Sequence, residues 1–224
     1  MDRPRSDPSL TAGTVTGFMA MPTFWQETPV ARVPVPRETV IDLVFRTRGR
    51  QLPTDHAWTL RQTIIQVLPW LEDEPKAGIH LIHGAQSGNG WQQPDDSSVI
   101  ELSARTRFVL RVPEHRIAQA RELSDQTLEI DGHAVTVLEA RVRPLTPFSA
   151  VLARHIRVSD STVDESIFLE HAAKWLDELD IAPTKMLCGR IRRFTTPGGP
   201  MLTRSLLIAE LNPKDSAAVQ YDGL

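Results

Sequence analysis

The order of hydrophobic patterns along the chain is the feature that most constrains its fold. Between Val40 and Leu145, apolar residues recur first at alternate positions and then at helical spacing. The whole stretch predicts strand, helix, strand, strand, helix and strand. This order is typical of a ferredoxin-like unit, a four-stranded antiparallel sheet with two helices on one face.

The pattern occurs a second time, although the sequence itself does not repeat. Residues 150–212 predict strand, helix and two strands, and a last helix begins at Pro213, so this round is one strand short. We therefore predict an α+β protein of tandem ferredoxin-like (RRM-like) units, with antiparallel sheets and helices on one face. The expected parts are an N-terminal extension (1–37), a first unit (38–146) and a second unit (147–224) without its last strand.

Local signals predict where several elements begin and turn. Asp55 is expected to cap the first helix, and Asp164 the helix of the second unit. Asp131-Gly132 predicts a hairpin with a type I′ turn. Residues 99–113 predict one long strand whose alternation changes at Ser103–Ala104, where we expect a bulge.

The choice of basic residues favours a nucleic-acid partner more than the net charge does. The formal net charge is only −3, but the cations are 21 arginines and 4 lysines. Arginine is the preferred residue for bidentate contacts with phosphate and for stacking on bases. Arg105 and Arg107 lie in one strand-like stretch, and Arg154 and Arg157 in another. These stretches are interpreted either as an RNA-binding face or as the solvated outer face of strands.

Cysteine content and motifs exclude several classes of protein. The single cysteine, Cys188, allows no disulfide framework and no zinc knuckle, which fits a reducing compartment and predicts a cytoplasmic protein. The sequence has no run of about 18 apolar residues, so we expect no membrane partner. His80 and His83 face opposite sides of a predicted strand, so no metal site is expected. Nucleotide-binding motifs are missing, and we expect no cofactor.

Two histidines are the candidates for catalysis. His56 opens the first helix, where the helix dipole disfavours the imidazolium and keeps a neutral base available. His80 lies in the next strand, and the topology allows the two to lie close together. Each histidine also has an interpretation without a catalytic role. His56 is then only a polar residue at the start of a helix, and His80 only a half-exposed residue of a strand. Ser87 and Asn89 either offer polar groups to a phosphate or only form a glycine-rich turn.

Isolated histidines are sufficient for one reaction on RNA. RNA supplies its own nucleophile, the ribose 2′-OH. An enzyme then needs a base for that proton, an acid for the leaving 5′-oxygen and cations for the developing charge. A four-stranded ferredoxin-like sheet is also a common RNA-binding platform. The residues by themselves favour a tandem RNA-binding protein, with a metal-free ribonuclease as the more specific hypothesis.

Several stretches, in one order, resemble a known family. They are "LPTDHAWTL" at the first helix, "LEIDGHAVTVLEARVRPL" across the predicted hairpin, and "VLARHIRV", "MLCGRIRRF" and "RSLLIAEL" in the second round. By their order and spacing, the chain resembles the CRISPR-associated repeat-RNA endoribonuclease family, in its Myxan-type branch. The resemblance covers residues 40–224 and does not include 1–37.

The resemblance implies an activity and a set of partners. Such a protein binds the hairpin repeat of a CRISPR precursor transcript, cuts at the base of the stem without a metal, and leaves a 2′,3′-cyclic phosphate and a 5′-hydroxyl. It then stays on the 3′ stem-loop of the mature guide RNA with the other subunits of a type I, Cascade-like complex. The sequence leaves defence and guided transposition equally open. The alternative is a non-catalytic subunit that caps the guide RNA handle.

The resemblance also implies roles for particular residues. The family's catalytic histidine lies in or just after the first helix, which ranks His56 first and His80 second. The family's second unit carries a basic hairpin that grips the stem, and "CGRIRRF" matches this role with Arg190, Arg192 and Arg193. Members of the family normally continue with a glycine-rich loop and a final strand. This agrees with the strand that the second round lacks.

Overall fold

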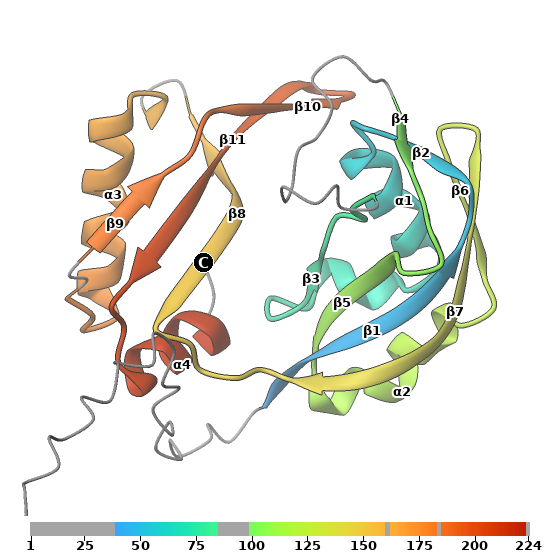
Figure 1. Cartoon of the computed structure of the whole chain (residues 1–224), viewed down its shortest axis with the longest axis horizontal. Helices are drawn as coiled ribbons and strands as arrows, with labels where there is room; N and C mark the ends of the chain where they lie inside the picture. Colours follow the sequence, from blue (N-terminus) through green and yellow to red (C-terminus); the bar gives the residue numbers. More distant parts are fainter. Residues whose placement is uncertain (1–38, 85–98, 160–161, 183–184, 223–224) are drawn as a thin grey trace, which may run out of the picture. The chain divides into compact units, whose positions relative to one another are not determined.

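The computed structural model in Figure 1 describes residues 39–84, 99–159, 162–182 and 185–222. By their contacts, these residues all belong to one compact unit, Ala31–Leu224. Within the described part of the chain, no helix has the length and apolar character needed to cross a membrane.

The first sheet has five antiparallel strands in the order β3-β5-β1-β7-β6. Its strands are β1 (Val40–Arg48), β3 (Gly78–Ile79), β5 (Arg107–Pro113), β6 (Thr127–Ile130) and β7 (His133–Pro144). The central strand β1 pairs with β5 on one side and with β7 on the other (Figure 1). When the β6–β7 hairpin is counted as one strand, the sheet has four strands, which follow one another in the sequence as β1, β3, β5 and β6–β7. Across the sheet they lie in the order β3, β5, β1 and β6–β7.

One face of this sheet packs against helices. The helical segments are α1 (Ala57–Val67), η1 (Pro69–Glu72), η2 (Glu114–Arg116), α2 (Ile117–Ala120) and η3 (Arg121–Leu123). Leu43 and Phe45 of β1 share one core with Leu60 and Ile64 of α1, and all four side chains are fully buried. Phe45 also stacks on Phe108 of β5, with the ring centroids 5.7 Å apart. Alternate residues of β1 therefore face the helices, as the sequence pattern predicts.

The second sheet is built around its longest strand. Its elements are β8 (Ala150–Val158), α3 (Glu165–Glu178), β9 (Lys185–Cys188), β10 (Arg192–Thr196), β11 (Gly199–Ala209) and α4 (Pro213–Asp222). β11 pairs with β8 on one side, and with both β9 and β10 on the other. Phe168 and Leu176 of α3 pack with Leu206 and Ile208 of β11 in a second core. Both sheets thus confirm the predicted fold class, an α+β protein of tandem ferredoxin-like topology.

The predicted long strand at 99–113 is wrong, because the chain divides it between two sheets. β4 (Val99–Glu101) pairs with β2 (Gln51–Pro53) in a separate two-stranded ribbon, and only β5 joins the large sheet. A turn replaces the expected bulge. In it, the N–H of Thr106 donates to the carbonyl of Ser103 at 2.9 Å, and the N–H of Ser103 donates to Oγ1 of Thr106 at 3.0 Å. Such local side-chain bonds compete with a strand ladder.

The first of the two strands that the sequence predicts after the second-round helix is also divided, between β9 and β10. At the break, the N–H of Gly189 donates to the carbonyl of Ser205 at 2.9 Å. The carbonyl of Gly189 accepts from Nη1 of the buried Arg204 at 2.8 Å. Gly189 lies so close to β11 that a Cβ on it would overlap Oγ of Ser205. A side chain on residue 189 therefore fits only if the Ser205 side chain moves away.

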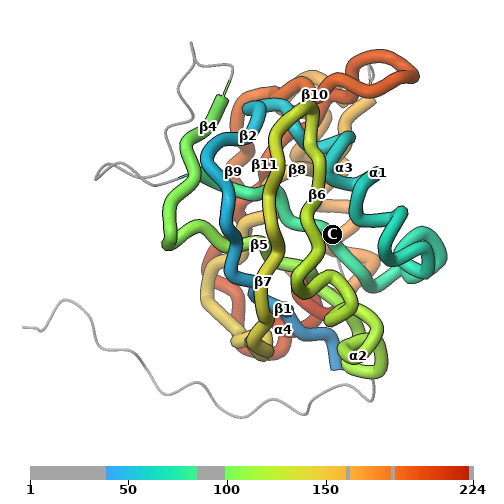
Figure 2. Tube along the Cα trace, turned by 90° about the vertical axis from the view of Figure 1, so that its right-hand side faces the viewer, coloured from blue at the N-terminus to red at the C-terminus, as the bar shows by residue number. Residues whose placement is uncertain are grey.

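Two local predictions are confirmed. Asp131 and Gly132 have positive φ angles of 48° and 81°, as a type I′ turn between β6 and β7 requires. Asp164 caps α3, where its carboxylate accepts from the N–H of Ser166 at 2.8 Å. The β6–β7 hairpin runs beside α1 (Figure 2), and Oγ1 of Thr59 in α1 donates to the Asp131 carboxylate at 2.7 Å.

Candidate nucleic-acid site

His56 lies directly before α1 and is only 2% exposed. Its Nε2 accepts a hydrogen bond from the backbone N–H of Ile82 at 3.2 Å, so the proton of the neutral ring is on Nδ1. Nδ1 then donates to the carbonyl of Pro53 at 2.7 Å. Burial lowers the pKa of His56, which keeps the ring neutral. In this arrangement both ring nitrogens are engaged, and the ring fastens the start of α1 to the segment after β3.

Asp55 is not the helix cap that the sequence predicts. The residue directly before α1 is His56, and its side chain makes no capping hydrogen bond. The carboxylate of Asp55 instead accepts from the backbone N–H of Thr195 in β10 at 2.7 Å. This charge-assisted bond joins the start of α1 to the basic hairpin of the second sheet. Its partner is 140 residues away in the sequence, so no local rule reveals it.

His80 follows β3 and is exposed, and its backbone N–H donates to the carbonyl of Val109 at 3.1 Å. Partial burial of the ring among protein atoms lowers the pKa of His80, and the charges of Arg111, Arg143 and Arg154 lower it further. The carboxylate of Asp42 acts in the opposite direction. The lowered pKa keeps the imidazole of His80 neutral, and the charges around it are mainly positive.

Asp42 of β1 holds two arginines on the face of the first sheet that lies opposite the core. Its carboxylate accepts from Nε of Arg111 in β5 at 2.9 Å and from Nη2 of Arg143 in β7 at 2.9 Å. Burial raises the pKa of Asp42, but the hydrogen bonds and charge of the two guanidinium groups outweigh it, so the pKa is lowered and the carboxylate stays ionised. One carboxylate between two arginines leaves this row of the sheet with a net positive charge.

Two further histidines lie near His56 and His80. Burial, followed by the charge of Arg154, lowers the pKa of the half-buried His83 to about 4. Burial, followed by the charges of Arg192 and Arg154, lowers the pKa of His155 to about 4. His83 also interacts electrostatically with the other three histidines. We call His56, His80, His83 and His155 the histidine cluster.

A β-bulge in β8 sets the direction of the His155 side chain. Arg204 of β11 is opposite Ile156, and Leu206 is opposite Ala153. One residue of β11 therefore faces two of β8, Arg154 and His155. Bulges of this kind redirect side chains and are frequent next to functional sites. The imidazole meets the ring of Phe194 edge-on, with centroids 5.1 Å apart and an angle of 82° between the planes.

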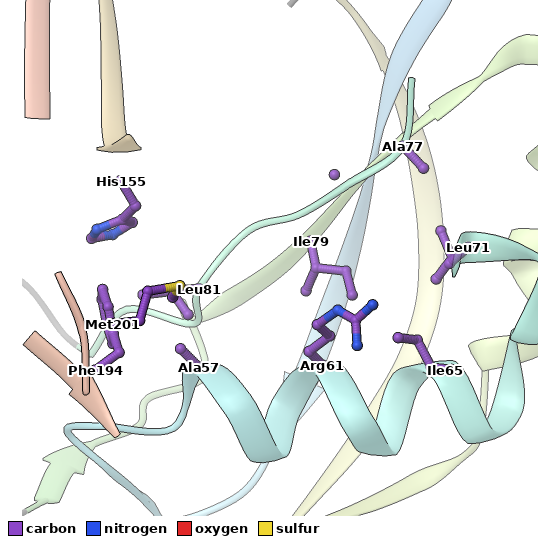
Figure 3. Close-up of a pocket in the computed structure, with 11 residues that line it drawn as sticks. Ala57, Arg61, Ile65, Leu71, Ala77, Ile79, Leu81, His155, Phe194 and Met201 are labelled. Atoms are coloured by element: carbon purple, nitrogen blue, oxygen red, sulfur yellow. The ribbon is translucent and has the colours of Figure 1, made fainter. Parts of the chain in front are cut away.

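His155 also lines a cavity of about 290 Å³ between α1 and strands of the second sheet. Its walls are mostly apolar and are formed by Ala57, Arg61, Ile65, Leu71, Ala77, Gly78, Ile79, Leu81, His155, Phe194 and Met201. Figure 3 shows His155, Leu81, Met201 and Phe194 together beside Ala57, at the start of α1. Arg61 and Ile79 lie further along the helix. The cavity therefore begins beside the histidine cluster and continues along α1.

The predicted arginines do not all lie in one place. Arg154 and Arg192 interact electrostatically with His155, so they belong to the surroundings of the histidine cluster. Arg157, Arg190 and Arg193 are exposed on β8 and on or next to β10. Arg105 lies in the turn before β5, and Arg107 is the first residue of β5, where its Nη1 donates to the carbonyls of Ala104 and Thr106 at 2.9 and 2.7 Å.

Two predicted site residues, Ser87 and Asn89, are outside the described residues.

Cys188 is half-buried at the end of β9, and burial raises the pKa of its thiol. In the part of the chain that the structure describes, no group of three His, Cys, Asp or Glu side chains is placed to hold a metal ion.

Sequence reasoning missed His83 and His155 as neighbours of the site. The motif "RHIR" at 154–157 contains His155, but a histidine in an arginine-rich strand is equally typical of a solvated face. Sequence reasoning also missed the link between Asp42, Arg111 and Arg143. An acid within the apolar strand at 40–45, opposite arginines in two later strands, is a signal that strand pairing would have revealed.

Comparisons with known proteins agree on one family. The Cas6 family, described as "Cas6 Crispr", matches residues 41–224. A curated relative from Myxococcus xanthus (strain DK1622), named CRISPR-associated endonuclease Cas6, is 24% identical over 184 residues. The alignment covers 82% of this chain and 75% of the relative. A solved structure of a CRISPR associated protein Cas6 has the same fold, with a TM-score of 0.50 and 10% identity, over 83% of this chain and 93% of that one.

Proposed function

We propose, because this chain belongs to the Cas6 CRISPR family, that it is an endoribonuclease that binds and cuts CRISPR repeat RNA. The family match over residues 41–224 is the observation that carries this proposal. The histidine cluster, with Arg154 and Arg192 beside it, supports it with chemistry suited to RNA.

The proposed reaction is an attack by the ribose 2′-oxygen on the adjacent phosphorus. A base takes the proton of the 2′-OH while the new P–O bond forms. The bond from phosphorus to the 5′-oxygen breaks, and an acid gives that oxygen a proton. The products are a 2′,3′-cyclic phosphate and a 5′-hydroxyl, and the reaction consumes no water or metal. Guanidinium groups near the phosphate stabilise the charge that develops on its oxygens.

His80 suits the role of base better than His56 in the conformation described. His80 is an exposed residue, whereas both nitrogens of His56 are engaged with Pro53 and Ile82. For His56 to accept a proton from RNA, its hydrogen bond with Ile82 would first have to break. We therefore propose His80 as the base and His56 as the residue that holds the start of α1, the reverse of the order expected from the family resemblance.

RNA binding itself is expected to tune the histidines. The charges of Arg154 and Arg192 contribute to the low pKa of His155, and Arg154 also lowers the pKa of His80. Phosphates that pair with these arginines offset their positive charge and add negative charge nearby, which raises the pKa of an imidazole. A base is most effective when its pKa is near the working pH. The substrate would thus bring the cluster closer to the basicity that catalysis needs.

Arginines outside the cluster are proposed to grip the repeat hairpin. Arg190, Arg192 and Arg193 lie on or next to β10, and all three are exposed. A further part of the proposal is that the protein stays on the 3′ stem-loop of the guide RNA, with other subunits of a type I complex, in the cytoplasm. Arg192 would then serve both the stem and the histidine cluster.

Cleavage of repeat RNA in EDTA tests the proposal. The wild-type chain is expected to cut one phosphodiester bond, and a 2′-deoxy substitution at that position should prevent the cut. His80→Ala should abolish cutting and leave the affinity for RNA unchanged, and His171→Ala on the exposed face of α3 is the matched control. If the wild-type chain requires a divalent metal, or if His80→Ala cuts normally, the proposed chemistry is wrong.

A second function is a subunit that binds the guide handle without cutting it. The observation that favours it is the engagement of both nitrogens of His56, the residue that the resemblance ranks first for catalysis. In the same experiment this function gives tight, salt-dependent binding with no cut RNA for the wild-type chain.

A further inference from the structure

We propose that the cavity beside His155 is a binding pocket for one unstacked nucleobase of the RNA. This inference rests on the proposed function, because it assumes that RNA is the ligand of the neighbouring cluster. It adds a contact that reads a base, whereas the arginines and histidines act on phosphate and ribose.

The size and walls of the cavity suit a single base. Its volume of about 290 Å³ is just below the range of about 300–1,000 Å³ for small-molecule pockets. Apolar side chains such as Ile79, Leu81 and Met201 form much of the wall. A base that leaves its stack needs apolar or aromatic surfaces on both faces to replace its former neighbours. The pocket offers such surfaces and has room for one ring system.

His155 supplies a polar group that such a base can use. Its Nδ1 is buried, and none of the described residues gives it a hydrogen-bond partner. A buried polar atom without a partner is destabilising, so a ligand that bonds to it gains affinity. The ring is held edge-on against Phe194 and is neutral near pH 7, because its pKa is about 4. A neutral imidazole nitrogen matches the donors and acceptors on the edge of a base.

Arg61 places a positive charge at the same cavity. It lines the pocket, and Nη2 lies 3.6 Å from the Glu72 carboxylate in an ion pair whose side chains are 44% and 56% exposed. An exposed pair of this kind contributes little to stability, so the guanidinium can turn to a phosphate at small cost. The cavity therefore combines an apolar body, one buried polar atom and a cation, which matches a nucleotide more closely than an apolar ligand or a peptide.

Binding of short RNAs to the full chain tests the pocket. The probes are eight-nucleotide homopolymers of A, C, G and U, and an abasic oligomer of the same length. Ala57→Leu fills the pocket from the start of α1, and His155→Phe keeps the ring but removes both nitrogens. His171→Phe is the matched control, because His171 is exposed on α3 and does not line the cavity. Fluorescence anisotropy gives the affinities, and thermal melting shows whether each variant is folded.

We expect both pocket variants to bind at least one of the four homopolymers about 5- to 150-fold more weakly, the range for the loss of one stacked base. The abasic oligomer should bind equally to all forms of the chain. The double variant should lose no more than Ala57→Leu alone, because both changes remove the same contact. If Ala57→Leu does not fold, the loss of affinity in His155→Phe decides the question.

Two results would overturn the inference. The first is that folded pocket variants bind every oligomer as the wild-type chain does, and the second is that they lose affinity for the abasic oligomer by the same factor. If the wild-type chain still cuts repeat RNA in either case, only the pocket is refuted. If the wild-type chain neither binds these RNAs nor cuts the repeat, the proposed function fails together with the pocket.

Discussion

Replacing His56 by alanine tests whether this residue holds the structure together or serves only in chemistry. The ring accepts from the N–H of Ile82 and donates to the carbonyl of Pro53. Ile82 is 0% exposed, so water does not readily replace the lost acceptor. His56→Ala therefore leaves two polar backbone groups at the start of α1 without their partners.

The magnitude follows from these two groups. An unsatisfied buried donor or acceptor costs about 1–3 kcal/mol, so the variant is expected to lose about 2–6 kcal/mol of unfolding free energy. For a chain of this size, 1 kcal/mol lowers Tm by about 2–4 °C, which gives a fall of about 4–24 °C. His56→Gln, whose amide has both a donor and an acceptor, should recover part of the loss.

Urea unfolding at pH 7.5 measures the free energy, and calorimetry measures Tm. His171→Ala, at an exposed position of α3, should stay within about 0.5 kcal/mol of the wild-type chain. If His56→Ala is as stable as this control, the two hydrogen bonds contribute nothing and the structural interpretation of His56 is refuted. If the predicted loss is found, cleavage by His56→Ala must be measured at a temperature at which the variant is folded.

Three further predictions concern pH, salt and packing. Histidines in the unfolded chain have a pKa of about 6.5, whereas those of His83 and His155 are about 4 in the folded chain, so the unfolded chain binds protons first. The unfolding free energy should thus be highest above about pH 6.5 and fall toward pH 4. In urea titrations, His155→Phe should show a smaller fall than the wild-type chain. A fall of the same size in both would contradict the low pKa assigned to His155. Removing Arg192 and Arg193 together should lower the slope of log affinity against log salt by about 1 to 2, while Lys174→Ala should not change it; an unchanged slope in the double variant would exclude these arginines as phosphate contacts. Gly189→Ala should cost about 1–3 kcal/mol in thermal melts through overlap with Ser205, and adding Ser205→Ala should recover most of it; no recovery would place the strain elsewhere.

The fold was predictable because its main signals are local. The alternation in β1 and the helical spacing in α1 and α3 each extend over 9 to 14 residues, and hydrophobic periodicity reports such lengths directly. The hairpin turn at Asp131-Gly132 was predictable because few residues adopt positive φ. These signals give the order of the elements, and the order is enough for the topology.

The interruptions of strands were not predictable, because they depend on partners outside the local window. Gly189 ends β9 through contacts with Ser205 and Arg204 of a later strand. The turn before β5 depends on one backbone and one side-chain hydrogen bond between Ser103 and Thr106, in a stretch that alternates like a strand. Periodicity records which residues are apolar, but it does not record where two backbones approach each other.

The candidate site was predictable only in part, for the same reason. His56 is predicted because it opens the first helix, and His80 because it lies in the strand that follows. His155 is 99 positions from His56 and joins the cluster only through the bulge in β8. The reversal in rank between His56 and His80 also required burial and hydrogen-bond geometry, which the sequence does not contain.

The hydrogen bond from Thr195 to Asp55 has a mechanical consequence. Thr195 belongs to the same short strand as Arg192 and Arg193, and Asp55 immediately precedes His56. Under the proposed function, any displacement of that strand by nucleic acid would either move the beginning of α1 with it or break this bond. Substrate capture and the arrangement of the imidazoles would then be coupled, so a change in how firmly the RNA is held would also change the geometry that acts on it.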